Sequence, residues 1–92
     1  MAMKRVKAIV SGRVQGVWYR ARTRDKALGL GLTGYVRNLP DGTVEIVASG
    51  EETQVNALMD WARQGPPMAE VSGLRIDEIA EDEGLSSFEV RF

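Results

Sequence analysis

A glycine-bounded stretch that ends in an arginine holds the residues best suited to chemistry. It reads Gly-Arg-Val-Gln-Gly-Val-Trp-Tyr-Arg from Gly12 to Arg20, between an expected strand and an expected helix. Gly12 and Gly16 allow backbone angles closed to other residues and let peptide N–H groups approach a ligand. A helix start adds unpaired N–H donors and positive potential. The stretch therefore predicts an anion site, with phosphate the natural ligand.

Arg20 supports this interpretation, because it lies where the helix dipole disfavours a cation by roughly 0.3–1 kcal/mol. A bound anion would explain its presence, and its guanidinium fork can hold two oxygens of one phosphoryl group. Glycine-rich turns between strands and helices also occur without any ligand. The spacing matches neither a Walker loop nor a dinucleotide fingerprint, so the loop by itself indicates no specific reaction.

Composition excludes several other kinds of site. The 92 residues include no Cys and no His, which removes disulfides, thiol nucleophiles and zinc-thiolate sites together with the commonest general base. The acidic pairs and runs at 77–78 and 81–83 have no opposing ligand set, so we expect no metal and no cofactor.

The charge balance argues against a protein dedicated to nucleic acid or to a membrane surface, since the formal net charge is −1. No apolar run is long enough to span a bilayer and no secretory pattern opens the chain, so we expect a cytoplasmic protein. No exposed apolar stripe is evident, and a monomer is expected. Basic residues nevertheless gather in the half that holds the loop: Lys4, Arg5, Lys7, Arg13, Arg20, Arg22 and Arg24.

The elements that position the loop can be predicted from periodicity. Alternation of Val6, Ala8 and Val10 indicates a strand before the loop, and a helix is expected over 20–30. A hairpin follows, with arms at 32–39 and 43–49 around the turn Pro40-Asp41-Gly42. Ser49 to Glu52 has the form of a capping box before a second helix that Gly65 and two prolines end. An interrupted strand over 69–79, an acidic turn at 81–84 and a closing strand at 88–92 complete the chain.

This order predicts one domain over residues 1–92 with an α+β, ferredoxin-like βαββαβ sandwich. We expect a mostly antiparallel sheet, two helices on one face and a short extra C-terminal strand. The first and second strands should run parallel with the third between them. The loop and Asn38, which follow the C-terminal ends of those two strands, should then lie at the same edge of the sheet.

Arg20 and Asn38 together suggest a reaction, although neither is a conventional nucleophile or base. A carboxamide can hold a water in line with a phosphoryl group that the arginine binds. Such a site would suit a substrate whose leaving group departs without protonation, because loose phosphoryl transfer depends on positioning and charge stabilisation. An acyl phosphate meets this condition, whereas a phosphate monoester meets it poorly.

Two segments also resemble the signatures of the acylphosphatase family. They are Gly12 to Arg20, quoted above, and Gly-Tyr-Val-Arg-Asn-Leu-Pro-Asp-Gly-Thr-Val-Glu from Gly34 to Glu45. The resemblance extends to the spacing between them, to Trp61 and Gly65-Pro66, and to the segment 88–92. It covers nearly the whole chain. The pair Trp18-Tyr19 replaces the Phe-containing pair common in the family.

The resemblance implies hydrolysis of the carboxyl-phosphate bond of a small-molecule acyl phosphate, without metal or phosphoenzyme. It implies that Arg20 is the phosphate-binding catalytic arginine and that Asn38 orients the attacking water. It also implies a phosphate cradle made by the backbone amides of Gln15, Gly16, Val17, Trp18, Tyr19 and Arg20. Inorganic phosphate or sulfate would then compete with the substrate.

Two alternatives remain at this point. Single-strand RNA-binding modules use the same βαββαβ order with aromatic residues on the open sheet face, where this chain offers Tyr35. An acylphosphatase-like regulatory domain is the other alternative, and the short chain argues against it. Among the remaining residues, we expect Trp61 to pack in the core and the terminal carboxylate of Phe92 to approach Arg20. The other arginines of interest are expected to be solvated: Arg13, Arg22, Arg24 and Arg37.

Overall fold

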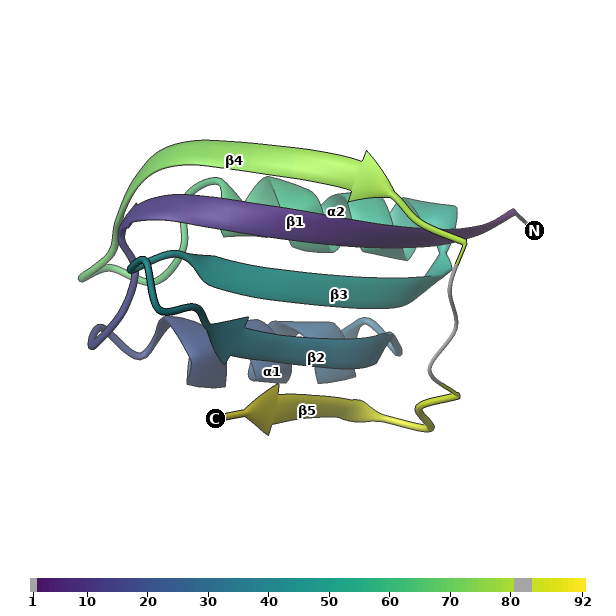
Figure 1. Cartoon of the computed structure of the whole chain (residues 1–92). Coiled ribbons are helices and arrows are strands. Elements are labelled where there is room, and N and C mark those ends of the chain that lie inside the picture. Colours follow the sequence, from purple (N-terminus) through teal and green to yellow (C-terminus); the bar gives the residue numbers. More distant parts are fainter. Residues whose placement is uncertain (1, 81–83) are drawn as a thin grey trace.

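The chain folds into five strands and two helices in the expected order (Figure 1). A computed structural model describes residues 2–80 and 84–92. The elements are β1 (Met3–Arg13), α1 (Tyr19–Gly29), β2 (Thr33–Asn38), β3 (Val44–Glu51), α2 (Glu52–Ala62), β4 (Glu70–Glu78) and β5 (Phe88–Arg91). The predicted α+β class and the βαββαβ order with a further C-terminal strand are confirmed.

The sheet has the strand order β4-β1-β3-β2-β5. β3 pairs antiparallel with both β1 and β2, and β5 pairs parallel with β2. β1 and β2 therefore run parallel with β3 between them, as expected. Their C-terminal ends, which lead into the loop and include Asn38, lie at the same edge of the sheet (Figure 1).

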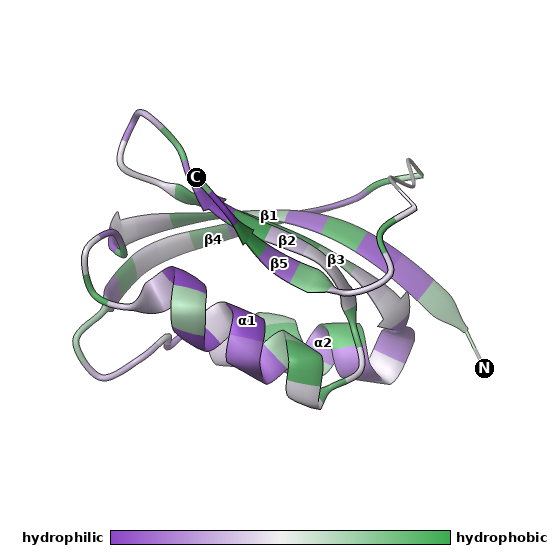
Figure 2. Ribbon diagram, turned by 90° about the horizontal axis from the view of Figure 1, so that it is seen from below, coloured by the Kyte–Doolittle hydropathy of each residue, from purple (hydrophilic) through white to green (hydrophobic). Residues whose placement is uncertain are grey.

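Both helices cover one face of the sheet, and the core lies between these two layers (Figure 2). The strand periodicity is confirmed on β1, where Val6, Ala8 and Val10 are fully buried. Each helix contributes a stripe at the expected spacing. The stripes consist of Tyr19, Thr23 and Ala27 on α1, and of Val55, Leu58, Met59 and Ala62 on α2.

The predicted capping box before α2 is wrong. Ser49 lies in β3, paired with Arg5 on one side and Thr33 on the other. The helix begins at Glu52, after an N-cap residue, Glu51, that makes no side-chain capping hydrogen bond. The reason is that the β1 ladder continues along β3 as far as Glu51, which keeps Ser49 extended.

The segment after Ala69 forms one continuous strand rather than an interrupted one. β4 pairs antiparallel with β1, with a register shift between Ser11 and Gly12. Each of its residues is exposed or partly buried, because β4 forms an edge of the sheet. An edge strand contributes few buried side chains, so its sequence pattern is weak. The acidic turn expected at 81–83 lies outside the described residues.

Candidate active site

The loop between β1 and α1 adopts unusual backbone angles. Gly16 has a φ of 73°, and Trp18, the N-cap residue of α1, has a φ of 66° and a ψ of 15°. Alternation of this kind turns successive N–H groups toward a shared concavity. Among the described residues, none accepts a hydrogen bond from a backbone amide of residues 15–20. The loop therefore presents a set of donors with no partner in the described fold.

Gly12 has a different role from the one expected. Its φ is 116°, and a Cβ at this position would clash with the backbone carbonyl oxygen of Glu70 and lie 2.7 Å from the nitrogen of Ser72. Gly12 is thus required for the close pairing of β1 with β4 at the register shift, not for access of a ligand. In contrast, a Cβ at Gly16 would have no neighbouring atom within 4 Å, so this position stays open to a ligand.

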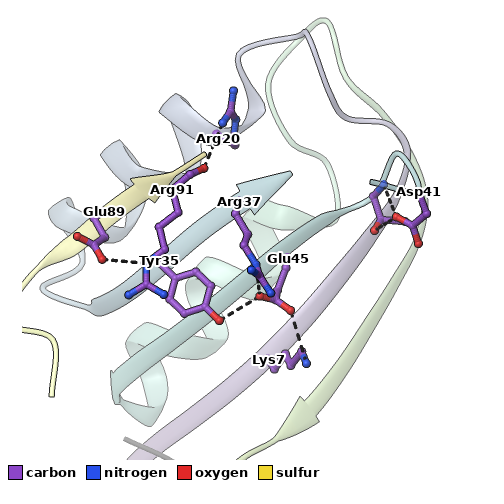
Figure 3. A network of polar contacts seen from close by, with 9 residues as sticks. Lys7, Arg20, Tyr35, Arg37, Asp41, Glu45, Glu89 and Arg91 are labelled. Carbon is purple, nitrogen blue, oxygen red and sulfur yellow. Dashed lines mark hydrogen bonds and ion pairs between the residues drawn. The ribbon is translucent and has the colours of Figure 1, made fainter. Parts of the chain in front are cut away.

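Arg20 projects from the first turn of α1 and is partly buried. Its Nη1 donates a hydrogen bond to the carbonyl oxygen of Arg91 at 3.2 Å (Figure 3). Its Cζ lies 4.7 Å from the centroid of the Phe92 ring. The end of the chain thus holds Arg20, but through the Phe92 ring and the preceding carbonyl rather than through the terminal carboxylate that was expected. These contacts fix the guanidinium beside the loop.

Asn38 ends β2 and lines the same pocket as Arg20 and Gly16, which has a volume of about 680 Å³. Its Oδ1 atom is buried and makes no hydrogen bond to any described residue. Buried polar atoms in folded proteins nearly always have a partner, so an orphaned acceptor in a pocket indicates a site for water or ligand. The convergence of Arg20 and Asn38 predicted from topology is confirmed.

Gln15 contributes a structural contact that the sequence did not reveal. Its side-chain Nε2 donates to the carbonyl oxygens of Leu39, at 2.9 Å, and Thr43, at 2.8 Å. These carbonyls flank the turn of the β2–β3 hairpin, immediately after Asn38. The side chain of Gln15 thus ties the loop to the strand end that holds Asn38. Spacing gave no signal for this contact, because both acceptors are backbone atoms.

The two aromatic residues before Arg20 point to different environments. Tyr19 is 1% exposed, and its hydroxyl donates to the carbonyl oxygen of Ala62 at 2.8 Å. Burial raises the pKa of Tyr19, which keeps this donor protonated. Its ring centroid lies 5.7 Å from that of Trp61, which confirms the packing role expected for Trp61. Trp18 is instead 76% exposed at the rim of the pocket.

Of the four arginines expected to be solvated, Arg13 is exposed and the other three form ion pairs. Arg24 lines the pocket and lies 3.2 Å from Asp25, which Arg22 also approaches at 4.0 Å. Arg37 is exposed, as expected, but it also forms an ion pair that was not anticipated from the sequence. Its Nε lies 2.8 Å from Oε1 of Glu45, and this hydrogen bond raises the pKa of Arg37.

The open face of the sheet bears a network of charged side chains around Glu45 (Figure 3). This carboxylate accepts hydrogen bonds from Arg37 and from the Tyr35 hydroxyl, and Lys7 lies 3.5 Å away. The guanidinium of Arg91 lies 4.0 Å from the centroid of the Tyr35 ring. The one aromatic ring expected as a platform for RNA bases is therefore covered by protein, which disfavours the RNA-binding alternative.

Within residues 2–80 and 84–92, no three carboxylate side chains cluster in a way that could hold a metal ion. No helix in the same part of the chain is both long and apolar enough to cross a bilayer.

The pocket combines a set of amide donors without protein partners, a guanidinium and a carboxamide oxygen. Such a set can bind a phosphoryl group and a water molecule together.

Comparison of the chain with known proteins shows the family to which it belongs. A family model described as Acylphosphatase matches residues 6–90. The chain belongs to the acylphosphatase family. The enzyme class expected from the two signatures, a hydrolase, and its substrate class, acyl phosphates, are confirmed at the level of this family.

Relatives in the acylphosphatase family match along almost their whole length. An acylphosphatase from Methylococcus capsulatus is 57% identical over 88 residues, which cover 96% of each chain. The solved acylphosphatase of Bacillus subtilis has a TM-score of 0.92 at 32% identity and covers 99% of this chain and 100% of its own. That of Coxiella burnetii has a TM-score of 0.90 at 46% identity, with 97% and 93% covered.

Proposed function

We propose that this acylphosphatase holds the phosphoryl group of its substrate on the loop amides and Arg20 while Asn38 positions the attacking water. The observation that supports this most strongly is the lack of protein partners for the amides of residues 15–20 within the described fold, in a pocket lined by both side chains. Phosphate oxygens would satisfy those donors.

Phosphate binding combines three favourable terms. The amides of the loop donate to the phosphoryl oxygens, and the N-terminus of α1 contributes positive potential at the same place. Arg20 adds charge-assisted hydrogen bonds, each contributing roughly 1.5–3 kcal/mol. Because the Arg91 carbonyl and the Phe92 ring hold the guanidinium, little side-chain freedom is lost when the anion binds.

Asn38 supplies orientation rather than proton transfer. Its buried Oδ1 accepts a hydrogen bond from a water, which turns a lone pair of that water toward phosphorus, opposite the leaving carboxylate. The new P–O bond forms as the bond between phosphorus and the carboxyl oxygen breaks. The products are inorganic phosphate and a carboxylate, and the proton of the water passes to phosphate or to solvent.

This chemistry needs no general acid, because a carboxylate leaves without being protonated. It needs no side-chain nucleophile either, in agreement with a sequence that has no His and no Cys. Charge stabilisation and alignment supply most of the rate enhancement in phosphoryl transfer of this type. A phosphate monoester, whose alkoxide leaves poorly, should therefore be a poor substrate.

The test is hydrolysis of acetyl phosphate and of p-nitrophenyl phosphate by the purified chain in the presence of excess chelator. We expect acetyl phosphate to be cleaved at an undiminished rate and the monoester to be cleaved far more slowly. Sulfate and inorganic phosphate should inhibit competitively. A requirement for added divalent metal, or faster cleavage of the monoester, would contradict the proposal.

A further inference from the structure

We propose that the acyl group of the substrate lies against the side chains of Trp18 and Phe92. It follows that the chain favours acyl phosphates whose acyl group is aromatic or otherwise apolar. This inference rests on the proposed function, because it takes the phosphoryl group to be bound by the loop and Arg20. It concerns the other half of the substrate.

Trp18 is an exposed aromatic residue in a backbone conformation that aromatic residues rarely adopt. Its side chain is 76% exposed, and its φ of 66° makes it the one non-glycine residue with a positive φ in the described chain. Strained conformations of this kind persist where the surrounding structure imposes them, and they gather at functional sites. Core packing does not explain this side chain, whereas contact with a ligand would.

Phe92 lines the same pocket and lies beside Arg20, the side chain proposed to bind the phosphoryl group. Its side chain is fully exposed, at 102%, yet its ring lies 4.7 Å from the guanidinium carbon of Arg20. An acyl group joined to a phosphoryl group on Arg20 would thus begin beside this ring. Two large exposed aromatic residues at one pocket provide apolar surface that only a ligand would cover.

The rest of the pocket favours an apolar occupant over a charged one. At about 680 Å³ it is far larger than a phosphate group needs, and Val14, Ala21 and Val90 add to its lining. Of the charged residues beyond Arg20, Glu89 is already paired with Arg91, whose Nε lies 3.0 Å from its Oε1. Arg24 is already paired with Asp25 at 3.2 Å.

The test compares benzoyl phosphate with acetyl phosphate in wild type, Trp18→Ala and Trp18→Phe. We expect Trp18→Ala to lower the ratio of the two kcat/KM values, benzoyl over acetyl, about tenfold, mainly through KM for benzoyl phosphate. Trp18→Phe should restore most of that ratio. The inhibition constant of inorganic phosphate, which has no acyl group, reports any disturbance of the loop amides, and we expect it to change less than the KM for benzoyl phosphate. Trp18 is the sharper probe, because replacing Phe92 also removes a contact of Arg20.

Met3→Ala is the matched control, since Met3 is 73% exposed at the opposite end of β1. It should leave both substrates unaffected. If Trp18→Ala does not fold, Trp18→Gly takes its place, because glycine reaches this φ without strain. An unchanged ratio, or equal losses for both substrates, would overturn the inference while leaving the proposed function standing. Failure of the wild-type chain to hydrolyse either substrate would instead refute the proposed function.

Discussion

At the scale of single residues, the site depends on a cation placed where the helix alone would not favour it. Arg20 lies at the N-terminus of α1, and its guanidinium is held by the carbonyl of Arg91 and the ring of Phe92. An isolated helix would favour an acidic residue here. A phosphate bound between the N-terminus of α1 and the guanidinium of Arg20 would explain this position.

Replacing Arg20 should therefore abolish function while leaving the fold intact. We expect Arg20→Ala to lower kcat/KM for acetyl phosphate by about a thousandfold or more, since two charge-assisted hydrogen bonds are lost. Its free energy of unfolding should change by less than about 1 kcal/mol. Arg20→Lys should recover little, because a point charge cannot reproduce the bidentate fork. Arg75→Ala, at an 81% exposed side chain on β4, is the control. Retention of most activity in Arg20→Ala would be inconsistent with its role.

Replacing Asn38 should separate binding from turnover. Asn38→Ala removes the oxygen that orients water but no group that binds phosphate, so we expect kcat to fall about a hundredfold or more and KM to stay within a few fold. Steady-state kinetics and inhibition by inorganic phosphate measure both quantities. Asn56→Ala, at an exposed site on α2, serves as the control. Equal loss of phosphate affinity and turnover would argue against water positioning.

The two side chains proposed to carry the chemistry could be named from the sequence, but the contacts that hold Arg20 could not. Arg20 stands out because the helix dipole disfavours a cation at a helix start, and Asn38 because the expected topology places it at the same edge of the sheet as the loop. The contacts that hold Arg20 involve a backbone carbonyl and an exposed ring at the end of β5. Neither contact leaves a periodic or compositional signal in the sequence.

At the scale of elements, the loop and the β2–β3 hairpin act as a unit because Gln15 joins them. Its side chain reaches the carbonyls of Leu39 and Thr43, just beyond Asn38. The spacing between the loop and Asn38 is thus set by a side chain as well as by the sheet. Small errors in such a distance strongly reduce rates.

Gln15→Leu should therefore impair catalysis more than stability. We expect a loss of about 1–2 kcal/mol in the free energy of unfolding for two hydrogen bonds. The kcat should fall about tenfold, because Asn38 and the loop are no longer held in register. Urea unfolding and steady-state kinetics give the two values. Gln64→Leu, at an exposed position after α2, should change neither. A full loss of stability with unaltered kcat in the folded fraction would show that Gln15 is structural only.

Element boundaries were predictable where one face of an element is buried and less so elsewhere. β1, α1 and α2 follow their buried stripes closely. The capping box failed because Ser49 has ladder partners on both sides, which local sequence does not reveal. The edge strand β4 has no fully buried side chain, so apolar and polar residues do not alternate clearly along it.

At the scale of the whole molecule, topology brings the two signatures together, and the open sheet face adds an ionic network. Glu45 is 3% exposed there, among Lys7, Tyr35 and Arg37. Burial raises the pKa of Glu45, but the hydrogen bonds from Arg37 and Tyr35 and the charges of Arg37 and Lys7 outweigh it. The pKa of Glu45 consequently lies below its ordinary value of 4.5.

This shift predicts the direction of a pH effect on stability. A lowered carboxylate pKa stabilises the fold above pH 4.5, and the contribution is lost as the pH falls through the folded-state value. Glu45→Gln should be less stable than wild type by about 1–2 kcal/mol at pH 7. The difference should shrink as the pH is lowered from about 5 to about 3 in urea titrations. Glu78→Gln, with a 74% exposed side chain, is the control. A difference that stays constant with pH would contradict this account.

The overall fold was the most predictable level, since the order of elements permits few ways of closing one sheet over two helices. That order alone places the loop and Asn38 at one edge of the sheet. The charged network of the open face was not anticipated, because strand alternation places Arg37 and Glu45 on their strands without showing that they pair across them. The burial of Glu45 arises from neighbours on β1 and β2 that only the register specifies.

The central claim is that Arg20 and the loop amides hold the phosphoryl group while water attacks phosphorus. Hydrolysis of benzoyl phosphate in ¹⁸O-labelled water tests it most directly, with mass spectrometry of both products after a single turnover. We expect the label in inorganic phosphate and none in benzoate. Label in benzoate would place the attack at the carboxyl carbon and would contradict the mechanism.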